Sequence, residues 1–177
     1  SSLLSWNERH VGDTAVRSFS EDLRQRIYSI ALIHERLYRS RDFGRIDLGG
    51  YTRELCHHLE AAHGSDQVRL RCEVVLLDMP IDAAVPVGLV LTELVANAFK
   101  HAFVGRSAGA IEVAITVEGG EAVLSVSDDG VGLAPDALER PGFGYDLART
   151  LASQLGAKLE IGGDAGTRIG LRFETGR

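Results

Sequence analysis

The segment from Glu93 to His101 places four reactive side chains at spacings that a helix would bring to one face. It lies in a mostly apolar stretch, from Ile81 to Phe103, with few helix breakers after Pro86, so we predict a helix there. At about 100° per residue, the polar positions fall within roughly a third of a turn. They supply a carboxylate, an amide, an ammonium group and an imidazole: Glu93, Asn97, Lys100 and His101.

Such groups on an otherwise apolar helix are costly to bury without partners, so we expect them to line a cleft or to meet a ligand. The oxygen atoms of Glu93 and Asn97 suit a hard cation such as Mg²⁺, with phosphate oxygens and waters completing its shell. Lys100 could then meet phosphate charge. The alternative is a solvated helix face with an i, i+4 polar pair, which this helix alone favours by about two to one.

A second set of candidate residues follows a predicted strand from Ala122 to Val126, along which the side chains alternate in direction. The strand leads into Asp128, with Gly130 and Gly132 just after it. These glycines would let a flat ligand approach the backbone, and the Asp128 carboxylate could accept a hydrogen bond from an exocyclic amine. The alternative is a tight turn, because Asp-Gly is a turn dipeptide by itself.

A third set, Gly142 and Gly144, opens a predicted helix that runs to about Leu155 and ends at Gly156. Glycines before a helix N-terminus present free N–H groups and a favourable dipole to phosphate. A single Gly-x-Gly often does no more than turn the chain, so the order and spacing of all three sets carry the argument.

Together these sets resemble the ATP-binding domain of bacterial sensor histidine kinases, part of the wider ATPase superfamily of gyrase, the Hsp90 chaperones and MutL. Four elements match in order over the C-terminal three quarters of the chain. They are the N-box (Glu93 to His101), the first glycine box (Asp128, Gly130 and Gly132), the second glycine box (Gly142 and Gly144) and the closing Gly-Thr element (Gly166 and Thr167).

The N-terminal part resembles the dimerisation region of the HWE-related histidine kinases. This likeness rests on Ala31 to Tyr38 in a long predicted helix, on Ser1 to Leu4, and on His101 in the N-box. The Trp-x-Glu that helps to define the strict HWE group is missing, since the corresponding stretch, Thr116 to Glu121, contains no tryptophan. We therefore place the chain beside that group rather than inside it.

The family's acceptor histidine lies early in the first helix, ahead of the segment that matches Ser1 to Leu4. His10 does not align with that position, and His34 belongs to the second predicted helix. The chain as given is therefore expected to bind ATP but to carry no histidine of its own to phosphorylate, so this fragment would lack autophosphorylation.

The resemblance implies phosphoryl transfer from Mg-ATP to a histidine nitrogen, for relay to a response regulator receiver domain. Glu93 would be the catalytic residue, orienting a metal-bound water or polarising the incoming imidazole, and Asn97 would hold Mg²⁺. Among the other ATP-binding residues, Lys100 and His101 would contact phosphates, and Asp128 would bind the adenine amine. Gly130 and Gly132 would let the ligand approach the backbone, and Gly142 and Gly144 would let a flap close over the phosphates. Thr167 would donate a hydrogen bond in the pocket.

Two other functions are weighed against the kinase. A catalytically silent phosphotransfer or scaffold protein with the same fold is the main alternative, although the intact site argues against it. An ATP-driven conformational machine of the gyrase, Hsp90 or MutL kind is disfavoured by the acidic charge and by the short predicted flap from Gly132 to Phe143.

The N-terminal region is predicted to be a helical hairpin. A first helix would end at about His10, Gly12 would break it, and a second helix with Asp13 as N-cap would continue to about Ser40. Its apolar residues recur every three or four positions, the spacing of the contact stripe, or seam, between helices of a bundle. They are Val16, Phe19, Leu23, Ile27, Ile30 and Leu37. Two helices cannot bury this seam alone, so we expect a homodimer that completes a four-helix bundle. His34 lies in the stripe and is favoured as a packed core histidine by about four to one.

We place the domain boundary at residue 44, with a dimerisation hairpin at 1–44 and a catalytic ATP-binding domain at 45–177. The latter should begin with a brief strand, a helix from Gly50 to His63, and one or two strands between Val68 and Leu77. Hairpins are expected around Gly119 and across residues 162–166. This order predicts an α+β sandwich, with helices on one face of a mixed, mostly antiparallel sheet. A metal site at His57, His58 and His63 is given about one chance in ten, because adjacent helical residues point in different directions.

The composition fits this organisation. The chain has 177 residues, is 45% hydrophobic and carries a net charge of −6, from 19 basic and 25 acidic residues. No basic block stands out, which argues against nucleic acid as the main partner. Cys56 and Cys72 show no metal-ligand spacing and are interpreted as partly buried thiols in a reducing compartment. We find no signal peptide and no apolar run of transmembrane length, and so expect a cytoplasmic chain without membrane contact, whose parent protein could still be membrane-attached.

Overall fold

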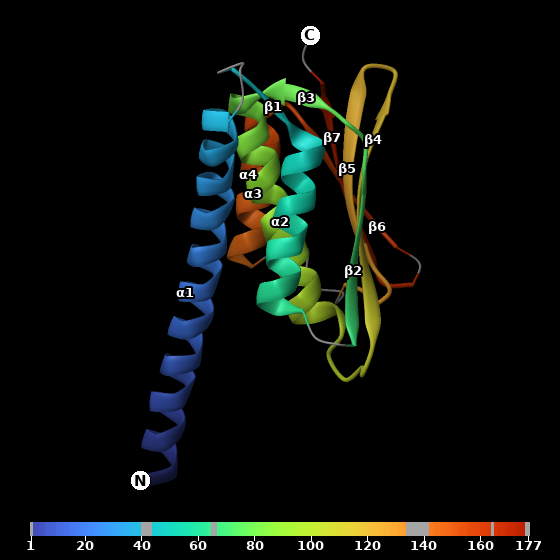
Figure 1. Cartoon of the computed structure of the whole chain (residues 1–177). Coiled ribbons are helices and arrows are strands. Elements are labelled where there is room, and N and C mark those ends of the chain that lie inside the picture. The colour runs from blue at the N-terminus through green and yellow to red at the C-terminus, as the bar shows by residue number, and fades with distance from the viewer. Residues whose placement is uncertain (1, 40–43, 65–66, 134–141, 164, 176–177) are drawn as a thin grey trace.

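The computed structural model describes residues 2–39, 44–64, 67–133, 142–163 and 165–175. It confirms the α+β class, with helices on one side of a five-stranded sheet (Figure 1). The strand order is β2 (Val68–Val74), β4 (Gly109–Glu118), β5 (Glu121–Asp128), β7 (Thr167–Glu174) and β6 (Lys158–Gly162). Because only the β2–β4 pairing is parallel, the sheet is mixed and mostly antiparallel, as predicted.

Strand register brings two of the predicted site residues together. β4 and β5 form a hairpin around Gly119 and Gly120, whose φ angles of 62° and 89° suit a tight turn that other residues adopt with strain. β5 then pairs with β7 so that Asp128, the last residue of β5, lies opposite Thr167, the first residue of β7. The predicted adenine-reading carboxylate and the Gly-Thr element thus meet at one end of the sheet.

Three helices pack on the sheet: α2 (Leu48–His63), α3 (Ile81–Asn97) and α4 (Phe143–Gln154). A small second sheet pairs β1 (Arg45–Asp47) with β3 (Asp78–Pro80) just before α2 and α3 begin. Asp47 caps α2, because its side chain accepts a hydrogen bond from the backbone N–H of Gly50 at 3.0 Å. Leu55 and Leu59 of α2 are fully buried in the core. The central part of the predicted flap, residues 134–141, lies outside the described residues.

Helix α3 ends in a π-helical turn, Ala98–Ala102, which carries Lys100 and His101. A π turn holds more residues than an α turn, so the assumed 100° per residue does not apply there. By length and composition alone the stretch Ile81–Ala102 could cross a membrane, which the sequence analysis missed. However, 61% of its apolar window is buried inside this fold, as expected of a helix at the centre of a core.

The prediction of an N-terminal helical hairpin was wrong. α1 is one continuous helix, Ser2–Arg39, whose N-terminal part extends beyond the rest of the molecule (Figure 1). The expected break at Gly12, with Asp13 as N-cap, does not occur. A glycine in a helix costs only about 1 kcal/mol relative to alanine, and an aspartate less, so a long helix can propagate through both.

Within this chain, α1 packs through a face other than the predicted bundle seam. α1 packs on α3 and α2 through Gln25, Ser29, Leu32 and Ile33. The predicted seam instead faces outward, with exposed fractions of 64%, 61%, 44%, 58% and 40% at Val16, Phe19, Leu23, Ile27 and Ile30. His34 is also exposed within this chain, about 100° round the helix from the buried Ile33, so its expected packing in the bundle seam would need a second copy and stays a prediction.

Candidate functional site

A cavity of about 410 Å³ lies between the end of α3, the end of β5, the start of β7 and the start of α4. The three predicted sets and the Gly-Thr element all contribute to its wall. The predicted site residues that line it are Asn97, His101, Asp128, Gly132, Gly142, Gly144 and Thr167. Apolar side chains such as Leu94, Val126 and Ile169 complete the wall, which suits a flat ligand with a few polar groups.

Asp128 is held in one orientation at the end of β5. Its Oδ1 accepts hydrogen bonds from the backbone N–H of Gly130 at 2.9 Å and from that of Thr167 at 3.2 Å. The pairing of β5 with β7 positions the second donor. Neither bond uses Oδ2, so this carboxylate can still accept a hydrogen bond from a ligand in the cavity.

Close backbone contacts explain several glycines of the site. A Cβ on Gly130 would lie 2.2 Å from the carbonyl oxygen of Ala102, and one on Gly166 would lie 1.9 Å from that of Asp128. Gly130 is not among the lining residues of the cavity, but it packs closely against Ala102, which is one of them. Gly142 differs, because a Cβ there would meet nothing within 4 Å.

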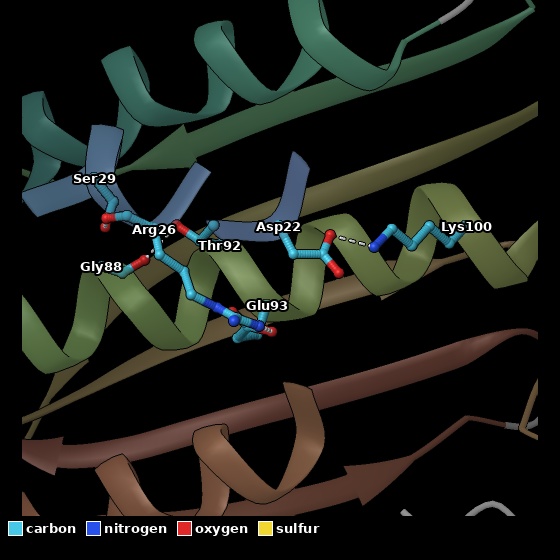
Figure 2. Close-up of polar contacts among 7 residues, drawn as sticks. All are labelled: Asp22, Arg26, Ser29, Gly88, Thr92, Glu93 and Lys100. Carbon is cyan, nitrogen blue, oxygen red and sulfur yellow. Dashed lines mark hydrogen bonds and ion pairs between the residues drawn. The ribbon is translucent and has the colours of Figure 1, made fainter. Parts of the chain in front are cut away.

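Glu93 does not line this cavity, because an arginine from α1 engages its carboxylate. Arg26 binds it in a two-pronged ion pair, with Nε 2.5 Å from Oε1 and Nη2 3.0 Å from Oε2 (Figure 2). The side chains are only 13% and 7% exposed, so the pair is largely removed from water. The hydrogen bond to Glu93 raises the pKa of Arg26, against the opposing effect of burial.

The start of α4 closes on the same pair. The Arg26 guanidinium lies 4.9 Å from the centre of the Phe143 ring, a cation–π arrangement. A Cβ on Gly144 would lie 2.4 Å from Oε2 of Glu93, so glycine allows α4 to approach α3 here. The second glycine box thus packs against the Arg26–Glu93 pair.

A second ion pair holds Lys100, whose ammonium group contacts the Asp22 carboxylate of α1 (Figure 2). Both pairs lie beside a neighbouring cavity of about 430 Å³ that shares Asn97, His101, Gly142 and Gly144 with the first. The four polar residues predicted to share one helix face therefore divide between two neighbouring cavities. Asn97 and His101 border both cavities, whereas Glu93 and Lys100 border only the second and are paired to α1.

Sequence reasoning missed Asp22 and Arg26. They stand four residues apart on α1 with opposite charges, a spacing usually interpreted as an intrahelical pair on a solvated face. Both residues lie outside the apolar stripe of α1. This position could have indicated that a second face of α1 packs against the rest of the chain.

The histidines of α2 make structural contacts. His58 stacks on Tyr28 of α1 with ring centres 3.4 Å apart, and His63 lies 6.0 Å from Phe99. Within the described part of the chain, no group of three or more His, Cys, Asp or Glu side chains could hold a metal ion.

Comparison with known proteins places the chain in a family. Residues 1–63 match a histidine kinase family, HisKA_2, and residues 82–177 match the histidine kinase-, DNA gyrase B- and HSP90-like ATPases. Blue-light-activated histidine kinase 2 of Erythrobacter litoralis is 29% identical over 131 residues, which are 71% of this chain but only 38% of that protein. The anti-sigma F factor of Geobacillus thermodenitrificans is 26% identical over 118 residues, covering 60% of this chain and 80% of that protein.

The fold has a solved counterpart. The histidine kinase domain of the E. litoralis EL346 blue-light activated histidine kinase superposes with a TM-score of 0.81 at 24% identity, covering 87% of this chain and 75% of that one. The family matches account for both the helical N-terminal segment and the sandwich that holds the cavity. The chain belongs to the family of histidine kinase-, DNA gyrase B- and HSP90-like ATPases, and carries a HisKA_2 histidine kinase segment at its N-terminal end.

Proposed function

We propose that this chain is the ATP-binding and dimerisation core of a two-component histidine kinase. It binds Mg-ATP and transfers the γ-phosphoryl group to a histidine nitrogen, for relay to a response regulator receiver domain. The observation that carries this proposal is the convergence of Asn97, Asp128, Thr167 and the second glycine box on one cavity of about 410 Å³. Family membership adds ATP as the nucleotide expected there.

Asp128 is the proposed adenine reader. Two backbone N–H groups fix its Oδ1, so the carboxylate is oriented before any ligand arrives. An adenine amine donates to this acceptor, whereas the carbonyl oxygen of guanine at the same place would face a negative charge. Thr167 supplies a hydroxyl in the same wall.

The phosphates are proposed to lie toward α4 and the π turn. Gly142 and Gly144 open α4, whose first backbone N–H groups have no partners within the helix and can bind phosphate oxygens. His101 borders both cavities, and Lys100 can reach phosphate once it leaves Asp22.

Asn97 and Glu93 offer the oxygen donors that Mg²⁺ prefers, and Asn97 borders the nucleotide cavity directly. Bound there, the ion would neutralise charge on the transferring phosphoryl group. Glu93 is the proposed catalytic residue, which orients a water or polarises the incoming imidazole after Arg26 releases it.

The exposed seam of α1 is the proposed contact with a second copy. Its five apolar residues follow helical spacing and are not covered within this chain. We propose residues 1–44 as the dimerisation segment and 45–177 as the catalytic domain. Leu23→Glu should abolish dimers in sedimentation experiments without unfolding the chain, because Leu23 is 44% exposed. A chain that is monomeric before mutation would remove the seam proposal.

The nucleotide site is tested by calorimetric binding of a non-hydrolysable ATP analogue, with and without Mg²⁺. Asp128→Asn should weaken binding by at least about 1 kcal/mol, roughly fivefold, since it alters a hydrogen bond to a charged acceptor. Asp129→Asn is the matched control, because the neighbouring carboxylate accepts from Ala110 N and does not line the cavity. Asn97→Ala should weaken binding more with Mg²⁺ than without it. Equal affinity in Asp128→Asn and wild type would exclude Asp128 from the adenine pocket.

One observation favours the second candidate, a catalytically silent phosphotransfer or scaffold protein. Both charged N-box residues, Glu93 and Lys100, are neutralised by α1 in this structure. Phosphohistidine formed on an added acceptor helix would support the kinase. Nucleotide binding without any transfer to that helix, in wild type and in Arg26→Gln alike, would support the silent protein.

A further inference from the structure

Helix α2 lies antiparallel across strand β2, and two hydrogen bonds fix how they align. Near the start of the helix, Arg53 donates from Nη1 to the carbonyl oxygen of Val74 at 3.4 Å. Two turns later, Oε1 of Glu60 accepts from the backbone N–H of Leu70 at 3.0 Å. The earlier residue of α2 thus contacts the end of β2, and the later residue contacts its beginning, so the helix and the strand run in opposite directions.

This alignment places the two cysteines of the chain opposite each other. Cys56 lies between Arg53 and Glu60 at helical spacing i, i+3, i+7, so all three share one face of α2. Cys72 lies midway between Leu70 and Val74, and alternate strand residues point to the same face. Cys72 packs against the buried core together with its alternate neighbours, whereas Arg71 on the other face is exposed.

The two facing thiols affect each other and differ in character. Hydrogen bonding between the two side chains lowers the pKa of Cys72 and raises that of Cys56. Burial raises the pKa of both thiols, and the positive charge of Arg53 lowers that of Cys72 in addition to the effect of Cys56. Cys56 is 1% exposed, whereas Cys72 is only partly buried on β2, which is an edge strand of the sheet. The more acidic thiol is thus also the more accessible one.

We propose that Cys56 and Cys72 form a reversible intramolecular disulfide when a hydroperoxide oxidises Cys72. The Cys72 thiolate attacks a peroxide oxygen, the O–O bond breaks, and Cys72 sulfenic acid forms with release of hydroxide or alkoxide. The Cys56 sulfur then attacks the Cys72 sulfur. The S–O bond breaks, and the hydroxyl group leaves as water with the Cys56 proton. An external dithiol would reverse the reaction by exchange.

The proposed site is independent of the nucleotide cavity and of the proposed function. The alignment of α2 with β2 sets the two cysteines at facing positions, where a disulfide bond of about 2.05 Å would join the two elements. The bond would tie the edge strand of the sheet to α2. That helix also holds α1, through Tyr51 Oη, which donates to the carbonyl oxygen of Ser29 at 3.1 Å, and through the Arg36–Glu54 ion pair.

The test treats the folded, reduced chain with a modest excess of hydrogen peroxide, alkylates free thiols under denaturing conditions, and measures the intact mass. The expected product is a monomer that has lost two hydrogens and takes up no alkylating agent, and that regains both thiols with dithiothreitol. Because the chain has two cysteines, such a product has only one possible pairing. Two alkylated thiols, a sulfinic acid on Cys72, or a disulfide-linked dimer would each overturn the proposal.

Variants separate the two thiol roles. Cys56→Ala should leave a Cys72 sulfenic acid that dimedone traps, while Cys72→Ala should leave Cys56 unreacted. Arg53→Gln should slow disulfide formation about threefold or more, because less Cys72 is thiolate. Arg71→Gln removes the same charge from the opposite face of β2 and should leave the rate unchanged. Equal slowing by both arginine variants would overturn the assignment of Arg53.

Discussion

Arg26 of α1 and Glu93 of α3 form a largely buried, two-pronged ion pair although they stand 67 residues apart in the sequence. Paired in this way, the Glu93 carboxylate is neutralised and turned from the proposed nucleotide toward α1. The catalytic role proposed for Glu93 therefore requires this pair to open, so the position of α1 and the chemistry of the N-box are linked.

Breaking this pair from one side should destabilise the fold. Arg26→Gln leaves Glu93 as a poorly solvated charge and should lower the free energy of unfolding by about 3 kcal/mol. Arg24→Gln is the control, since Arg24 is 71% exposed in its pair with Glu21 and its loss should change stability by no more than about 0.5 kcal/mol. Urea unfolding measures both.

The double variant Arg26→Gln/Glu93→Gln should be less destabilised than the sum of the two single variants, with a coupling of at least about 1 kcal/mol. Simple additivity of the two effects would show that the ion pair does not stabilise the docking of α1 on α3.

The Asp22–Lys100 pair should compete with phosphate for the lysine. Asp22→Asn should tighten binding of the Mg-ATP analogue by about two- to fivefold, because a partly exposed pair is worth about 0.5–1 kcal/mol. Glu21→Gln is the matched control: it removes a neighbouring carboxylate that pairs with Arg24 rather than with Lys100. Unchanged affinity in Asp22→Asn would mean that Lys100 does not move to the phosphates.

Local sequence signals predicted the elements of the site well. The strand before Asp128, the helix after Gly142 and the hairpin at Gly119 depend on periodicity and turn chemistry within a few residues. Their convergence on one cavity followed from the family resemblance and is seen in the structure.

Long-range choices were less predictable. The side of α1 that packs on α3 is decided by contacts with residues far along the chain, and the helix buried Leu32 and Ile33 rather than the more regular apolar stripe. The Arg26–Glu93 pair also depends on contacts between residues far apart in the sequence, so local patterns could not predict it. At the end of α3, the π turn changed the angular spacing on which the predicted four-residue face depended.

The two glycine boxes should respond differently to alanine. Gly130→Ala brings a methyl group against the backbone oxygen of Ala102, which cannot rotate away, and should cost about 1–3 kcal/mol of stability while weakening the nucleotide site. Gly142→Ala meets nothing within 4 Å at an ordinary φ of −71°, so its stability should change by less than about 0.5 kcal/mol. Urea unfolding of both variants checks this, and equal costs would contradict the steric argument for Gly130.

Acid should destabilise the chain through His63. Burial lowers the pKa of His63, and the nearby charge of Lys100 lowers it further, against weaker opposing effects of Glu21 and Asp22. The folded pKa therefore lies below the ordinary value of 6.5, and below that pH the unfolded chain binds more protons than the folded one. Stability is thus fully present above about pH 6.5 and falls as the pH drops through the folded pKa.

His63→Gln should remove part of this loss, so that its urea midpoint changes less than that of the wild type between about pH 7.5 and about pH 5.5. His57→Gln, at an exposed position on the same helix, should keep the wild-type pH dependence. His63 is suited to this effect because its Nε2 is buried and has no hydrogen-bond partner among the described residues that would stabilise a proton there. If His63→Gln and wild type lost the same stability between these pH values, the acid sensitivity would come from other groups. Protonation of His63 would then make no contribution to it.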